Sequence, residues 1–158
     1  MRFSENGIKM LIALEGEKLK AYLDSAGIWT IGVGHIGSVD GVKISRSTVI
    51  TREKSRELLR EDLKRFEICV NRYVHKVLTQ FEYDALVIFV FNIGCSGFTT
   101  STALTRLNRL EPPERVTEAM SWWNKATVKG QKVVIPGLNN RRKAEIDLYL
   151  RGRYVGVN

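Results

Sequence analysis

Three polar side chains near the N-terminus have the types and the spacing that cleavage of a bond between two sugars requires. Eight residues separate Glu15 from Asp24, and five more separate Asp24 from Thr30. Hydrolysis of a glycosidic bond uses one carboxyl group that donates a proton to the leaving oxygen. It also uses a second, ionised carboxylate that acts on the anomeric carbon or on water. The pattern therefore makes these three residues candidates for a glycosidase site.

The surroundings of the two carboxyl groups predict different roles for them. Ile8, Leu11 and Ile12 follow helical spacing, and Glu15 continues their apolar stripe. We therefore expect the Glu15 carboxyl to be desolvated and to act as the acid. Asp24 lies in a polar turn and is expected to stay ionised, with Thr30 holding the attacking water beside it. The alternative is that both are ordinary solvated surface residues.

Short elements of two kinds must position these side chains. A helix is expected to begin at Ser4 and to end at Gly16. Residues 19–22 and 28–33 are rich in strand formers, and turn residues join them, so they predict a β-hairpin. A third short strand is expected over residues 42–44. Together these elements predict a small sheet lobe.

The rest of the chain has helical patterns. Thr51 begins a long amphipathic segment that is expected to continue to residue 78. Further helices are expected over 81–93, 101–110, 113–125 and 138–150, with a loop or small hairpin over 127–137. The sequence thus predicts an α+β fold in one domain. Its sheet lobe covers approximately residues 16–50, its linking helix 51–78, and its helical lobe 79–158 together with the N-terminal helix.

Composition limits the partners. The 158 residues include 25 Lys and Arg against 17 Asp and Glu, a net charge of +8. This charge favours an acidic partner: a nucleic acid, an anionic membrane surface or a charged polymer such as a bacterial envelope. No helix-turn-helix or aromatic stacking pattern favours nucleic acid, and no zinc spacing, metal site or cofactor motif is found. The longest apolar run, residues 85–91, is too short to span a membrane. Without a recognisable secretory signal, Cys69 and Cys95 are expected to be free thiols.

Four anchors in order along the chain then identify a resemblance. The first is Leu14-Glu15-Gly16 through Lys20-Ala21-Tyr22 and Asp24 to Trp29-Thr30-Ile31-Gly32-Val33-Gly34-His35. The others are Asp84-Ala85-Leu86 with Phe91-Asn92-Ile93-Gly94, Gly97-Phe98 with Ser101-Thr102, and Pro136-Gly137-Leu138 with Asn140-Arg141-Arg142. With these anchors the chain resembles the phage-type lysozymes of glycoside hydrolase family 24. These are endolysins of the bacteriophage T4 and P22 kind, and the shorter lambdoid prophage branch is the most similar.

The resemblance implies an activity and roles for particular residues. It implies a muramidase that hydrolyses the β-1,4 bond between N-acetylmuramic acid and N-acetylglucosamine of peptidoglycan and so lyses the host cell. Glu15 would be the proton donor, Asp24 the second catalytic carboxylate and Thr30 the hydroxyl next to the catalytic water. Arg141 matches an arginine that pairs with the catalytic glutamate, although a basic residue on an exposed helix is the alternative. The family fold has a sheet lobe, a helical lobe, a long joining helix and a cleft between the lobes.

Other residues receive secondary roles. Ile36, Phe91 and Ser101 fall where the family lines its saccharide cleft, and Phe91 could equally belong to the core. His35 lies at a strand end without a nucleophile or metal partner, which favours a supporting role. We expect a monomer that contacts peptidoglycan glycan strands, with an anionic envelope surface as a further partner of its basic C-terminal cluster, Arg141, Arg142, Lys143, Arg151 and Arg153.

Two departures and two alternatives stay open. Glu17 adds a third carboxylate near the site and is expected to face solvent. No export anchor is recognised at the N-terminus, so a protein made in the host cytoplasm would reach periplasmic peptidoglycan through a holin-type membrane lesion. A lytic transglycosylase would cut the same bond with a single glutamate and would not need Asp24 or Thr30. A non-catalytic peptidoglycan-binding or nucleic-acid-binding module is the alternative from another class.

Overall fold

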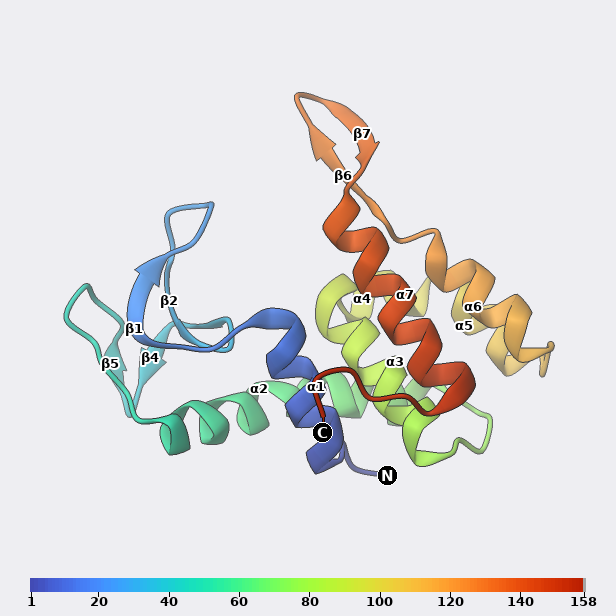
Figure 1. Ribbon diagram of the computed structural model, residues 1–158, viewed down its shortest axis with the longest axis horizontal. Helices are drawn as coiled ribbons and strands as arrows, with labels where there is room; N and C mark the ends of the chain where they lie inside the picture. Colours follow the sequence, from blue (N-terminus) through green and yellow to red (C-terminus); the bar gives the residue numbers. More distant parts are fainter. Residues whose placement is uncertain (158) are drawn as a thin grey trace. The chain divides into compact units, whose positions relative to one another are not determined.

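The computed structural model describes residues 1–157, which form two compact units. One unit, called here the sheet unit, consists of Leu11–Lys64. The other, called here the helical unit, consists of Met1–Met10 and the chain from Arg65 onward. Helices α1 (Glu5–Glu15) and α2 (Arg52–Tyr73) each begin in one unit and end in the other (Figure 1). The α+β fold class expected from the sequence is confirmed.

The sheet unit is built from two small antiparallel sheets. The first has the strand order β1 (Lys18–Leu23), β2 (Trp29–Gly32), β3 (His35–Ile36), and the predicted hairpin is its β1–β2 pair. The second pairs β4 (Ser38–Val39) with β5 (Val42–Lys43). Their core is a cluster of three buried isoleucines, Ile31, Ile44 and Ile50.

Two glycines have conformations that allow these elements to form. Gly16 has φ +81° and donates its amide to the Ile12 carbonyl at 2.8 Å, so it ends α1 as the sequence predicts. Gly32 has φ +65°, and a Cβ atom there would lie 3.1 Å from Ser55 Oγ of α2. A side chain at position 32 would therefore both strain the backbone and crowd the helix.

The helical unit is arranged around α3 (Gln80–Ile93), whose residues from Tyr83 to Val90 are all buried. A capping box between Thr79 and Glu82 begins this helix, and α7 (Pro136–Arg151) packs along it. The remaining elements of this unit are α4 (Cys95–Thr99), α5 (Thr102–Asn108), α6 (Pro113–Ser121), β6 (Lys125–Val128) and β7 (Gln131–Val134). Strands β6 and β7 form a hairpin, one of the two forms expected for this segment.

The long helix is shorter than the sequence predicts, because α2 ends at Tyr73 rather than at residue 78. The side-chain amide of Asn108, which lies 35 residues further along the chain, donates to the Tyr73 carbonyl at 2.8 Å. Its oxygen accepts from the His75 amide, also at 2.8 Å. A side chain from α5 thus caps α2, and local spacing gives no sign of such a contact.

The expectation of two free thiols is wrong. Cys69 of α2 and Cys95 of α4 form a disulfide, with their Cα atoms 6.0 Å apart and a sequence separation of 26 residues. The helix α4 that carries Cys95 lies between the helices expected over 81–93 and 101–110, where the sequence predicts no helix. The fold brings Cys95 of α4 to Cys69 of α2, and local sequence patterns do not indicate this pairing.

A buried carboxylate connects three distant segments of the helical unit. Asp84 of α3 accepts hydrogen bonds from the Ser4 amide and hydroxyl, from Gln80 Nε2 at 2.9 Å and from Tyr154 Oη at 2.6 Å. Ser4 Oγ in turn accepts from the Gly7 amide at 3.0 Å, so Ser4 caps α1 as expected. No helix within residues 1–157 has the length and the apolar character needed to cross a bilayer.

Candidate active site

Asp24 is positioned by the turn that it organises. It directly follows β1, and its Oδ1 atom accepts from the amides of Ala26 at 2.8 Å and Ile28 at 2.9 Å. Its backbone amide donates to the Ile28 carbonyl at 2.9 Å, which closes the loop between β1 and β2. The loop therefore uses one carboxylate oxygen of Asp24. Within residues 1–157, no hydrogen bond engages the other, Oδ2.

Thr30 lies in the middle strand of the first sheet, where its Cα is paired with Tyr22 on one side and Ile36 on the other. Its side chain is buried, and Oγ1 donates to the Ile28 carbonyl at 2.9 Å. The hydroxyl proton is thereby committed, so the oxygen can only accept a hydrogen bond from a further group such as water. Asp24 and Thr30 both hydrogen-bond to Ile28, which makes this residue the link between them.

Glu15 is the last residue of α1, directly before the glycine that ends the helix. Its side chain is exposed, whereas Ile8 and Leu11 on the same helix are buried. The expected desolvation of Glu15 is therefore wrong: the apolar stripe ends before it, in the last turn. Burial does not single out Glu15 as the acid, since the Asp24 carboxylate is less exposed than that of Glu15.

The expectation that Glu17 faces solvent is also wrong. Its side chain is only 11% exposed and lies 3.6 Å from the Nε atoms of both Arg52 and Arg56 of α2. The third carboxylate near the site is thus neutralised by two guanidinium groups. It joins the start of β1 to the long helix.

His35 connects β3 to α2. Its Nδ1 lies 2.8 Å from Asp62 Oδ2, and its Nε2 lies 2.8 Å from the Ser38 carbonyl. Both ring nitrogens are engaged by groups of the sheet unit. This geometry supports the structural role expected for His35.

Ile36 lies on the rim of a cavity of about 390 Å³ in the sheet unit. The cavity is also lined by Ile28, Trp29 and Lys43, with the buried Ile44 beneath. Ile36 is 53% exposed and Ile28 45% exposed, which is unusual for isoleucine in a small domain. The cavity therefore has an apolar lining with one cation, Lys43. Two of its lining residues are close to Thr30: Ile28 precedes Thr30 by two positions, and Ile36 is paired with it across the strands.

The remaining predicted site residues belong to the helical unit. Arg141 is 9% exposed rather than on an exposed face. Its Nε donates to Glu145 Oε2 at 3.0 Å, and its Nη2 donates to the Ile88 carbonyl at 3.2 Å. The pairing of Arg141 with Glu15 stays a prediction.

Arg141 belongs to a buried charged cluster that sequence reasoning missed. Glu145 is fully buried and also lies 2.6 Å from the Nε atom of Arg142. Burial raises the pKa of Glu145, although Arg142 and Arg141 act in the opposite direction. Arg142, assigned from sequence to a basic surface cluster, is 1% exposed and donates to the Trp123 carbonyl and to Asn92 Oδ1.

Phe91 and Ser101 have structural contacts of their own. Phe91 is half-buried and packs edge-on against Phe66 with ring centroids 5.2 Å apart. Ser101 is buried, donates to the Phe98 carbonyl at 2.7 Å and accepts from the Leu104 amide at 3.1 Å, which caps α5. Their assignment to a saccharide cleft stays a prediction.

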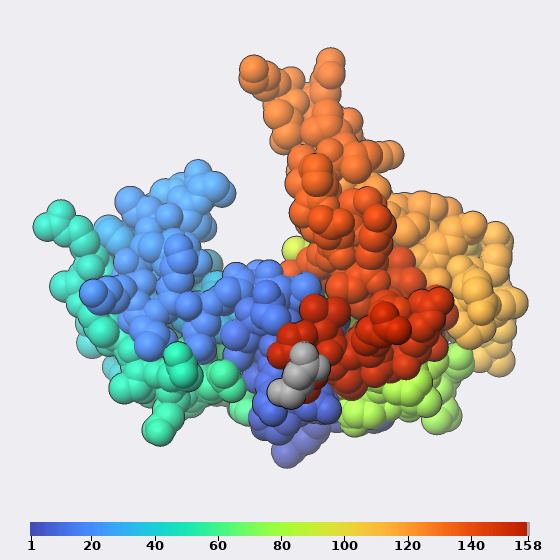
Figure 2. Space-filling model, in the orientation of Figure 1, coloured from blue at the N-terminus to red at the C-terminus, as the bar shows by residue number. Residues whose placement is uncertain are grey.

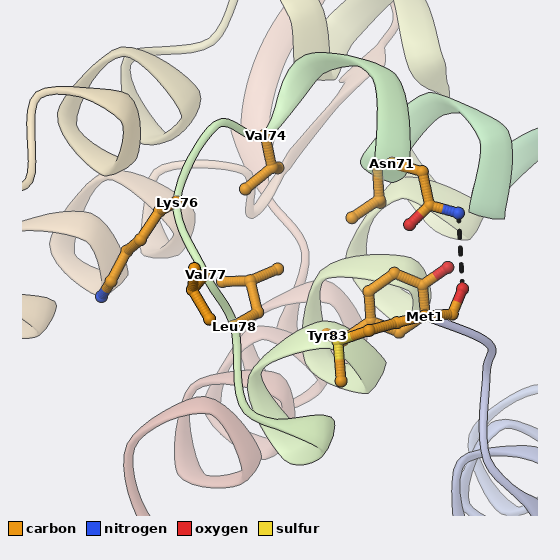
Figure 3. A pocket seen from close by; sticks show the side chains of 8 residues that line it. Met1, Asn71, Val74, Lys76, Val77, Leu78 and Tyr83 are labelled. Atoms are coloured by element: carbon orange, nitrogen blue, oxygen red, sulfur yellow. Dashed lines mark hydrogen bonds between the residues drawn. The ribbon is translucent and has the colours of Figure 1, made fainter.

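A separate cavity of about 270 Å³ lies in the helical unit, between the end of α2 and the start of α3. Val70, Val74 and Leu78 give it an apolar lining, and Asn71 donates to the Met1 carbonyl at its edge (Figure 3). None of the predicted site residues lines this cavity. Among residues 1–157, no group of three His, Cys, Asp or Glu side chains has an arrangement that could hold a metal ion.

Comparisons with known proteins give the context for this arrangement. The family model described as Phage lysozyme matches residues 12–145. The endolysin of Salmonella phage P22 is 46% identical over 150 residues, which cover 95% of this chain and 99% of that protein.

Two solved structures have the same fold over nearly the whole chain. The endolysin from Escherichia coli O157:H7 phage FAHEc1 has a TM-score of 0.91 and 42% identity, covering 98% of this chain and 96% of its own. The muramidase domain of SpmX from Asticaccaulis excentricus has a TM-score of 0.86 and 36% identity, covering 94% and 97%. With a family model that matches most of its length and relatives of this similarity, the chain belongs to the phage lysozyme family and is a lysozyme-type glycoside hydrolase.

Proposed function

We propose that this lysozyme hydrolyses the β-1,4 bond between N-acetylmuramic acid and N-acetylglucosamine in peptidoglycan. In this proposal Glu15 is the general acid, and Asp24 and Thr30 position and activate the water. The observation that carries it is the sharing of Ile28, whose amide and carbonyl hold Asp24 Oδ1 and Thr30 Oγ1. These bonds leave Asp24 Oδ2 and the acceptor side of Thr30 Oγ1 for a water molecule.

The proposed water-activating step uses both acceptors. One hydrogen of the water is donated to Thr30 Oγ1, which has already given its own proton to a backbone carbonyl. The other hydrogen is donated to Asp24 Oδ2. The water oxygen then attacks the anomeric carbon, and its proton passes to Asp24.

The leaving group needs a proton in the same reaction. Glu15, exposed at the end of α1, donates it to the glycosidic oxygen as the bond from that oxygen to the anomeric carbon breaks. Attack by a water held on one carboxylate while another protonates the leaving oxygen inverts the configuration at the anomeric carbon.

A single experiment separates this proposal from its alternatives. Purified peptidoglycan is incubated with the wild type, with Glu15→Gln and with Asp24→Asn, and the products are identified by mass spectrometry. Hydrated reducing-end muropeptides from the wild type, with strong loss in both variants, are expected. Anhydro-muropeptides, or activity that survives Asp24→Asn, would instead indicate a lytic transglycosylase. An inactive wild type would indicate a binding module.

The same family membership supports a proposal for the biological setting. We propose that the enzyme is made in the cytoplasm of a bacterial host and reaches periplasmic peptidoglycan through a holin-type membrane lesion. In this proposal the enzyme is a monomer, and its cleavage of peptidoglycan lyses the cell. Fusion of residues 1–40 to a periplasmic reporter tests the route. A reporter that stays inactive without a lesion is expected, and unaided export would contradict the proposal.

A further inference from the structure

The β6–β7 hairpin of the helical unit contains no buried residue, and even Val128 and Val133 are 46% and 39% exposed. All ten residues from Lys125 to Val134 are exposed, and the hairpin projects beyond the helices that flank it (Figure 2). A two-stranded hairpin without a covering partner is marginally stable in water. This hairpin therefore adds little to the core of the unit, and its exposed surface is available for contact with a partner.

The register of the hairpin separates its side chains onto two faces. Lys125 is paired with Val134, and Thr127 with Lys132, so Lys125 and Lys132 lie diagonally on one face. The turn between the strands contains Lys129, with φ +50°, and Gly130, with φ +78°, which is typical of a tight hairpin turn. The hairpin thus has two lysines on one face and a third at its tip.

No carboxylate balances these three charges. Residues 119–144 contain six Lys and Arg and no Asp or Glu. Two of the six, Arg141 and Arg142, are buried with Glu145. In the described part of the chain, none of Lys125, Lys129 and Lys132 forms an ion pair, whereas Lys54, for comparison, lies 2.9 Å from Asp40. Clustered like charges repel each other, and an external anion would relieve this repulsion.

We propose that the β6–β7 hairpin is a docking arm for the free carboxylates of the peptide stems that peptidoglycan carries on its muramic acid residues. The inference rests on the proposed function for the identity of the polymer. Peptidoglycan presents these carboxylates at regular intervals along each glycan strand. Three cations on a projecting hairpin match such an array better than a single compact anion.

A lipid bilayer fits this surface less well. The face of the hairpin opposite Lys125 and Lys132 presents Ala126, Val128 and Val133 with Gln131. Elements that insert into the headgroup region carry large aromatic or leucine side chains on the apolar face, and this face has none. Its apolar surface is too small to hold the hairpin in a membrane.

The test removes the charge of the hairpin and the charge of the substrate in turn and measures KM in each case. Lys125, Lys129 and Lys132 are all replaced by Gln, and KM is measured on intact sacculi and on sacculi whose stem carboxylates have been amidated. The expected KM of the triple variant on intact sacculi is about tenfold higher than that of the wild type, with kcat unchanged. Each exposed ion pair is individually weak, and the loss of three of them together corresponds to a change of about this size. Amidation is expected to raise the wild-type KM to a similar value and to leave that of the triple variant unchanged.

A matched variant controls for net charge. Lys9, Arg72 and Arg109 are exposed residues of the helical unit, and their replacement by Gln removes the same number of charges elsewhere. This control is expected to keep the wild-type KM on intact sacculi. Thermal unfolding of both variants close to that of the wild type would show that the comparison concerns folded protein.

Several results would overturn the docking role. The first is a rise in KM for the control variant that equals the rise for the triple variant. The second is an equal change in KM of the wild type and the triple variant on amidation of the sacculi. The third is a triple variant that loses binding to phosphatidylglycerol vesicles but not to sacculi. Failure of the proposed function looks different, because the wild type would then release no reducing ends from any substrate. In that event, co-sedimentation of the same variants with intact and amidated sacculi still tests the hairpin.

Discussion

Asp24 has two functions that different substitutions separate. Asp24→Asn retains an oxygen that can accept from the Ala26 and Ile28 amides, and it removes the negative charge that the chemistry requires. We expect its kcat for muropeptide release to fall at least about a hundredfold with little change in the free energy of unfolding. Asp24→Ala removes the oxygen as well and should also lose about 1 kcal/mol of stability. Urea unfolding and muropeptide release measure the two effects.

The opposite result for these two variants would contradict the assignment of Asp24 as a catalytic carboxylate. If Asp24→Asn kept the wild-type kcat and Asp24→Ala lost only stability, the carboxylate would serve the turn alone. The two substitutions are matched because both act on the same loop. Wild-type protein at the same pH is the reference for each.

Thr30 provides a second test at the level of one side chain. Thr30→Val has nearly the same shape but no hydroxyl, so it cannot accept a hydrogen from water, and its kcat should fall about a hundredfold. Thr30→Ser keeps the hydroxyl and should stay within about threefold of the wild type. Equal activity of the valine and serine variants would show that only the shape of this buried residue matters.

The sequence nominates candidate residues, and the structure corrects the environments expected for some of them. Residue types and spacing alone nominate Glu15, Asp24 and Thr30, because the chemistry restricts which groups are useful. Helical spacing wrongly extends the buried stripe to Glu15, since periodicity does not show where the core ends. The burial of Glu17 depends on Arg52 and Arg56, which lie more than thirty residues away in the chain.

At the level of elements, the disulfide between α2 and α4 makes a testable contribution to stability. The bond closes a loop of 26 residues, which the chain-entropy model converts to about 3.5 kcal/mol of stabilisation. Urea unfolding with and without a reducing agent should show this difference. The double variant Cys69→Ser with Cys95→Ser should match the reduced wild type and be insensitive to the reductant. Coincident unfolding curves of oxidised and reduced wild type would contradict the prediction.

The boundaries of the elements could be predicted only where local signals set them. Ser4, Gly16 and Thr51 begin or end helices through their own backbone or side chains, and the sequence identifies these positions. The end of α2 depends on Asn108, and the disulfide depends on a helix, α4, of only five residues. Contacts between segments far apart in the chain leave no periodic pattern, so these features could not be predicted.

For the whole molecule, buried tyrosines predict a loss of stability at high pH. Burial is the main cause that raises the pKa of Tyr83 from 10.0 to about 12, and burial also raises the pKa of Tyr149 and of Tyr154. Below pH 10 these phenols are neutral in both the folded and the unfolded chain, so their full contribution is present. As the pH rises toward 12 the unfolded chain loses their protons first. The free energy of unfolding should then fall by about 1.4 kcal/mol per pH unit for each of the buried residues Tyr83 and Tyr149, and by less for Tyr154, which is only partly buried.

Urea titrations at closely spaced pH values between 9 and about 11.5 measure this slope. Tyr83→Phe cannot ionise, and its slope should be smaller than that of the wild type by the share of one tyrosine. An unchanged slope in this variant would show that Tyr83 does not contribute.

The fold class could be predicted for the whole chain, since alternating and helical patterns occupy separate segments. The expected lobes begin and end with whole elements. The two compact units divide α1 after Met10 and α2 after Lys64, and the expected lobe boundaries stay a prediction. A helix that continues from one unit into the next has the same periodicity on both sides of such a boundary, so the pattern gives no sign of the division.

The Asp84 cluster also has a consequence for the order of folding during synthesis. A ribosome releases Ser4, Gln80 and Asp84 well before Tyr154, which follows Asp84 by 70 residues. Until then the carboxylate has its partners from the first and third helices but lacks the phenol that completes its hydrogen bonds. While residues 85–153 are being translated, the nascent chain therefore lacks one of the hydrogen-bond donors to this buried carboxylate.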